Sequence, residues 1–180
     1  MKIQYIIYLT CLLMISFSAC QNMSSESVDN SNVAFFDLKG YFENEIETFN
    51  HKTLKKTTSI NGEGETKTMT EFDIAKEMKL FTKINLKNPA WQDKFKISQS
   101  ESQEVYEALD EKLSVQKVII DKLGSEITKV SIISGSNNAV ITKDKEMIYE
   151  PNKGYSIESI QDVALVGKND IKIEVVFVEE

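Results

Sequence analysis

The chain has 180 residues, enough for one domain with a single core, and a formal net charge of −7 at pH 7. Its basic residues are all lysines, because arginine is absent. This composition argues against nucleic-acid binding, which needs a basic surface to neutralise phosphates. It also argues against bidentate clamps on phosphate or carboxylate groups, which depend on the guanidinium fork.

The first twenty residues have the pattern of a secretory signal. Lys2 provides a positive start, an apolar run covers residues 3–17, and the run ends at Phe17-Ser18-Ala19-Cys20. The run is too short to span a bilayer comfortably. Its exit resembles the lipobox of bacterial lipoproteins, in which the chain is cut before the cysteine and the thiol is acylated. The resemblance implies a signal peptide over residues 1–19 and lipidation at Cys20.

Cleavage at this position defines the expected mature chain. It removes Cys11 and one lysine, so the net charge becomes −8 and no free thiol remains. Residues 20–32 are small and polar, which predicts a flexible tether, and residues 33–180 are expected to form a single domain. Lipoproteins kept at the inner membrane often carry Asp after the cysteine. Gln21 at this position therefore implies an outer-membrane lipoprotein of the cell envelope, on the periplasmic face.

A first helix is predicted over residues 33–50. Asn32 or Ser31 is expected to cap its start. Its apolar residues recur at intervals of three and four, as on one face of a helix: Phe35, Leu38, Phe42, Ile46 and Phe49.

A β-hairpin and a second helix are expected next. Residues 54–60 and 65–69 are predicted strands, joined through the turn signal Asn61-Gly62. Thr70 is expected to open a helix with a capping-box pattern, and Asn88-Pro89 to end it, because the residue before proline avoids helical geometry.

The rest of the chain reads as short β segments separated by turn signals. The segments are 94–97, 105–109, 113–121, 127–133, 140–143, 146–150, 155–161, 163–166 and 171–178. Connections this short favour antiparallel pairing of neighbours. A phase change near Gln116-Lys117 indicates a β-bulge or a strand buried on both faces. The predicted fold is α+β: two helices packed on a long, curved antiparallel meander, as an open or partial barrel.

Residues with catalytic potential are sparse. His51 is the only histidine, and its place near the end of the first predicted helix favours a structural role against the helix dipole. A multi-histidine zinc site cannot be built, and no EF-hand spacing is present. We therefore expect no catalytic residue, no metal, no cofactor and no enzymatic activity.

Three aromatic residues are candidates for contact with a ligand or partner. Trp91, the only tryptophan, either anchors a partner or locks a helix onto the sheet. Tyr149 and Tyr155 bracket one tight turn, and either pair across adjacent strands or line the mouth of a cavity.

The whole layout resembles a family of small lipoproteins of bacterial envelopes. The likeness is carried by the segments Phe17–Cys20, Phe35–Phe49, Asn61-Gly62, Asn88–Trp91 and Tyr149–Gln161. That group has no established activity, so the resemblance implies no catalytic residues. We expect a lipid-anchored, non-enzymatic interaction or binding module with an envelope protein as its partner. The alternative is a carrier or sensor that holds a hydrophobic small molecule in a curved-sheet pocket.

Overall fold

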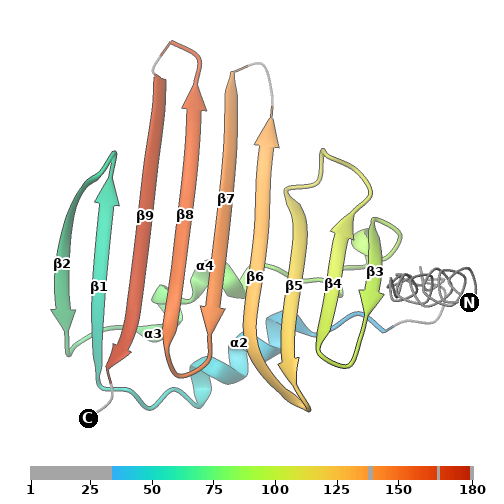
Figure 1. Cartoon of the computed structure of the whole chain (residues 1–180), viewed down its shortest axis with the longest axis horizontal. Coiled ribbons are helices and arrows are strands. Elements are labelled where there is room, and N and C mark those ends of the chain that lie inside the picture. The colour runs from blue at the N-terminus through green and yellow to red at the C-terminus, as the bar shows by residue number, and fades with distance from the viewer. Residues whose placement is uncertain (1–33, 138–139, 166, 179–180) are drawn as a thin grey trace, which may run out of the picture.

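The computed structural model describes residues 34–137, 140–165 and 167–178 (Figure 1). The expected signal peptide, the tether and Cys20 lie outside the described residues. Within them the chain is mostly β, with one sheet and a thin helical layer. The strands are β1 (Thr53–Ile60), β2 (Glu63–Met69), β3 (Phe95–Gln99), β4 (Gln103–Ala108), β5 (Val115–Leu123), β6 (Glu126–Asn137), β7 (Ile141–Glu150), β8 (Gly154–Val163) and β9 (Gly167–Val178). The helices are α2 (Leu38–Glu47), α3 (Ile74–Glu77), α4 (Lys79–Thr82) and the 3-10 turn η2 (Pro89–Trp91).

All pairings between the described strands are antiparallel. The order across the sheet is β2-β1-β9-β8-β7-β6-β5-β4-β3. The predicted meander is therefore confirmed from β3 to β9, and the predicted hairpin is confirmed as β1 and β2. Asn61 and Gly62 both have positive φ, 52° and 86°, as a two-residue primed turn requires. The hairpin joins the meander through β1, which pairs with β9, the last strand of the chain.

The sheet is not closed or strongly curled, so the expected open or partial barrel is wrong. The hairpin β1–β2 extends the sheet at one end, while β3 forms the other edge. The segment from β2 to β3 crosses one face of the sheet and carries α3, α4 and η2. Because these elements and α2 cover the apolar face, the sheet can bury it without closing on itself. We call this the inner face and the opposite one the outer face.

The first helix is shorter than the sequence predicts. Asp37, and not Asn32 or Ser31, is the N-cap of α2, and its carboxylate accepts a hydrogen bond from Gly40 N at 3.0 Å. The preceding residues are non-helical, and the N–H of Phe36 donates to the hydroxyl of Tyr106 on β4. The long-range contact and the local cap together move the start of the helix.

The second predicted helix is broken into two single turns. Asp73 caps α3 by accepting a hydrogen bond from Lys76 N, so the predicted capping box at Thr70 does not form. Met78 separates α3 from α4, with Phe81 of α4 fully buried. Packing of single apolar residues, rather than continuous helical hydrogen bonding, shapes this segment.

The long strands also depart from the prediction in two places. β7 runs through Asp144-Lys145 without a break, and Gly167–Asp170, expected as a turn, begins β9. The predicted irregularity in β5 is confirmed as a register shift between Val115 and Lys117.

The core lies between the helical layer and the inner face. Aromatic residues dominate its centre, where the rings of Phe42 and Phe81 lie 5.0 Å apart and Tyr149 packs edge-on against Phe42 at 5.3 Å. In Figure 1 the helices cross behind the lower part of the sheet, and the upper ends of β6 to β9 extend beyond them. No helix of the described residues covers the inner face of those upper ends.

Candidate functional site

Tyr149 and Tyr155 lie in the core and attach the helices to the sheet. They face each other across β7 and β8, and are only 2% and 5% exposed. The hydroxyl of Tyr149 donates to Glu45 on α2, and that of Tyr155 donates to Glu77 on α3 at 2.6 Å. Burial and the neighbouring carboxylates raise the pKa of both hydroxyls far above the usual value. The cross-strand pairing is thus present, and both hydroxyls are held by carboxylates in the interior.

Trp91 is half-buried on η2 and packs against Phe95 of the edge strand β3, with 5.6 Å between ring centroids. This placement matches the alternative in which tryptophan locks a helical turn onto the sheet. Partner binding by Trp91, Tyr149 and Tyr155 stays a prediction, and in this arrangement all three residues contribute to packing.

His51 lies between aromatic rings instead of at a helix end. α2 stops at Glu47, and the imidazole packs 5.3 Å from the ring of Phe49 and 5.4 Å from that of Phe177. Within the described ranges, no group of three or more His, Cys, Asp and Glu side chains is placed to hold a metal ion. No helix in that same part of the chain is long and apolar enough to cross a membrane.

Side chains fill the space between the helices and the sheet. Leu38, Phe42, Leu54, Phe81 and Leu86 are all fully buried there and belong to one continuous cluster with the strand residues. A carrier for a hydrophobic molecule needs an apolar cavity in this layer. The packing of the described residues gives that alternative no support.

The feature best placed to bind another protein is the edge of the sheet at β2. Across the described residues β2 pairs only with β1, so its other side is an open edge of seven residues. Every β2 residue except Met69 is exposed, and its register with β1 is regular from end to end. β2 contains no proline, and no bulge interrupts its pairing. Prolines and bulges are two of the devices that proteins use to block pairing at an edge strand, and β2 has neither of them.

The hairpin geometry determines which backbone groups of β2 point outward. In a two-residue hairpin the residues that flank the turn form a hydrogen-bonded pair, and the pattern then alternates along the ladder. The N–H and C=O groups of Gly64, Thr66 and Thr68 therefore point away from β1. The hydroxyls of Thr57 and Thr66 lie 2.9 Å apart, as expected for a pair of the closer, non-hydrogen-bonded type.

The sequence did not identify these three residues as site residues. The Asn61-Gly62 turn predicts the hairpin, but no local signal shows that β1 pairs with β9 and leaves β2 outermost. A hint was the composition of β2, which has no apolar residue before Met69 and so nothing to bury.

Comparison with known proteins adds no relative, since no family model, no curated protein and no solved structure matches this chain.

Proposed function

We propose that the chain is a lipid-anchored, non-enzymatic docking module of the cell envelope, which binds a partner protein by strand addition at β2. Cys20 would carry the lipid, and the outer membrane, on its periplasmic face, is the proposed location. The partner would supply an extended segment that becomes the next strand of the sheet.

The open β2 edge is the observation that carries this proposal. The backbone of Gly64, Thr66 and Thr68 offers alternating donors and acceptors with no partner strand beside them in the described chain. Each backbone hydrogen bond formed by an added strand is worth about 0.5–1.5 kcal/mol net. Several such bonds along β2, less the free energy needed to order the partner segment, give reversible binding.

The side chains of β2 favour some partners over others. On the outer face Gly64, Thr66 and Thr68 are small and allow close approach of a strand. On the inner face Glu65 and Lys67 form an exposed ion pair at 2.8 Å. A strand with opposite charges facing these two side chains would be preferred, because like charges directly opposite are destabilising.

Replacement of Thr66 by proline tests the proposal. Thr66→Pro removes an outward N–H and leaves the hydrogen bonds to β1 intact, as is tolerated on an edge strand. The matched control is Thr66→Val, which loses the same hydroxyl but keeps the N–H. After crosslinking in intact cells, the wild type and Thr66→Val should recover the same dominant envelope protein, and Thr66→Pro should lose it.

Two controls accompany this experiment. Thermal denaturation must show that both variants are folded, and Cys20→Ser should abolish acylation and release the chain from the membrane fraction. Recovery of the same partner by folded Thr66→Pro would contradict docking at β2. Recovery of only a second copy of the chain would replace a partner protein by self-association.

A further inference from the structure

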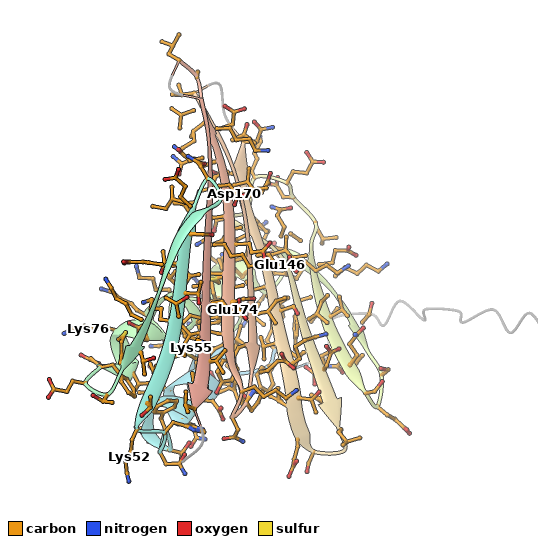
Figure 2. The ribbon with its side chains drawn as sticks, turned by 60° about the vertical axis from the view of Figure 1, so that its left-hand side comes forward. Lys52, Lys55, Lys76, Glu146, Asp170 and Glu174 are labelled. Atoms are coloured by element: carbon orange, nitrogen blue, oxygen red, sulfur yellow. The ribbon has the colours of Figure 1, made fainter. Side chains whose placement is uncertain are left out.

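The two faces of the upper ends of β6 to β9 differ in charge. The outer face of β7, β8 and β9 is mainly acidic, with two lysines, Lys168 and Lys172, opposite Asp162 and Glu158. Its acidic residues are Asp144, Glu146, Glu158, Asp162, Asp170 and Glu174. Figure 2 shows Glu146, Asp170 and Glu174 distributed over these strands, with Lys76 set apart on the helical layer. The alternate positions face inward, above the helices, and include the apolar residues Ile141, Val163 and Ile171. We call the polar residues among them the polar shelf: Ser134, Ser136, Lys143, Lys145, Ser159, Gln161 and Asn169.

The polar shelf holds positive charge without a carboxylate. The strand register places Lys145 between Ser134 and Ser159, and Lys143 between Ser136 and Gln161. No acidic residue occupies an inner-face position of β6 to β9 in the described residues. The polar shelf is therefore locally positive, although the formal net charge of the protein is −7.

A pocket opens where the shelf meets the end of the helical layer. Its volume is about 220 Å³, and its lining includes Ile84, just after α4, together with Ser134, Ser136, Lys143 and Lys145. The pocket is therefore lined by apolar residues, by serines and by two lysines, and its volume admits a small polyatomic ion.

The two shelf lysines differ from other half-buried lysines of the chain. Lys56 and Lys122 are paired with Glu77 and Glu104. By contrast, Lys143 and Lys145 are half-buried and make no ion pair with any residue that the structure describes.

Electrostatics reinforces this contrast. Burial lowers the pKa of Lys145, and the nearby charges of Lys143 and Lys83 lower it further. The mutual repulsion of these cations raises the free energy of the folded protein, and a bound anion would reduce that repulsion.

We infer that the polar shelf binds an anion of the phosphate type, with Lys143 and Lys145 supplying charge and Ser134 and Ser136 supplying hydroxyl donors. Lysine binds phosphate as a point charge and does not need the bidentate guanidinium fork, which this chain lacks. Free phosphate and the phosphodiester of a lipid headgroup share this chemistry. The two lysines are separate from the β2 edge, because β8, β9 and β1 lie between β7 and β2 in the sheet.

The test compares two double variants with the same change in net charge. Lys143→Gln/Lys145→Gln alters the shelf, and Lys55→Gln/Lys96→Gln alters two exposed lysines on the outer face. The full chain, in a phosphate-free neutral detergent, is titrated with inorganic phosphate and separately with glycerophosphoglycerol, the deacylated headgroup of phosphatidylglycerol. Binding is followed by calorimetry at constant ionic strength.

The wild type and the outer-face control should bind at least one of the two probes with the same affinity, and the shelf variant should bind it at least tenfold more weakly. Preference for glycerophosphoglycerol identifies a headgroup site, and preference for phosphate identifies a free anion. Equal affinity in both double variants, or binding of neither probe by the wild type, overturns the inference. Without ligand the shelf variant should melt no lower than the wild type, because two mutually repelling cations are removed.

Discussion

Glu77 is the main polar link between α3 and the sheet, and its removal makes a strong test of how the helical layer is held. α3 has only four residues and buries none of them completely. The Glu77 carboxylate lies 2.7 Å from the Lys56 ammonium and accepts a hydrogen bond from the Tyr155 hydroxyl at 2.6 Å. The Glu77 side chain is 15% exposed, so water reaches this network poorly.

The expected loss of stability for Glu77→Ala is about 3 kcal/mol. The hydroxyl of Tyr155 is left buried without a partner, which costs about 1–3 kcal/mol. The ion pair to Lys56 adds about 1 kcal/mol or less, because that ammonium still reaches solvent. Tyr155→Phe removes only the donor and should cost about 1–2 kcal/mol.

Urea denaturation of the two single variants and the double variant measures these values. Because both single changes break the same bond, the double variant should lose about 1–2 kcal/mol less than the sum of the two. Additive losses would show that the Glu77 and Tyr155 side chains do not interact. A loss under about 0.5 kcal/mol for Glu77→Ala would refute the claim that this carboxylate anchors α3.

Three further predictions concern packing and acid stability. Gly154→Ala should unfold the protein or destabilise it by about 3 kcal/mol or more in urea, because φ is 146° and a Cβ would lie 1.9 Å from the Val175 carbonyl oxygen. Phe42→Ala should cost about 3–5 kcal/mol in the same assay, because the fully buried ring packs against Phe81 of α4 and Tyr149 of β7. The hydrogen bond from the N–H of Gly40 holds the pKa of Asp37 below its usual value. The stabilisation from this hydrogen bond is therefore present near neutral pH, and it is lost as pH falls through the folded-state pKa of Asp37. Melting temperatures of Asp37→Asn and wild type should differ near pH 7 and converge in acid.

Local signals in the sequence predicted much of the sheet. Asn61-Gly62 requires positive φ at two successive residues and so predicts the hairpin. Short connections between apolar segments predict the antiparallel meander, because they leave no room for crossover helices. The phase change near Gln116 marks the register shift in β5. Each of these features is set by residues close together in the chain.

Features set by distant residues could not be predicted in the same way. The start of α2 depends on the contact of Phe36 with Tyr106, which lies seventy positions away. The pairing of β1 with β9 has no local signature, and it places β2 at one edge of the sheet, opposite β3 at the other. The sequence left open whether Tyr149 pairs across strands or lines a cavity, because its carboxylate partner Glu45 lies on a distant element, α2.

The two features proposed for binding were only partly visible in the sequence. Lys143-Asp144-Lys145-Glu146 alternates in sign, which puts lysines and acids on opposite faces of any strand. The alternation does not show where the helical layer ends, and that end is what makes the shelf a pocket next to Ile84.

Amide hydrogen exchange along β2 tests the central claim most directly. In the isolated chain, the amides of Glu65 and Lys67 should exchange slowly because they point to β1, and those of Gly64, Thr66 and Thr68 should exchange fast. In the chain recovered with its envelope partner, the three outward amides should become protected. Protection of Gly64, Thr66 and Thr68 in the isolated chain, or fast exchange in the complex, would contradict docking by strand addition at this edge.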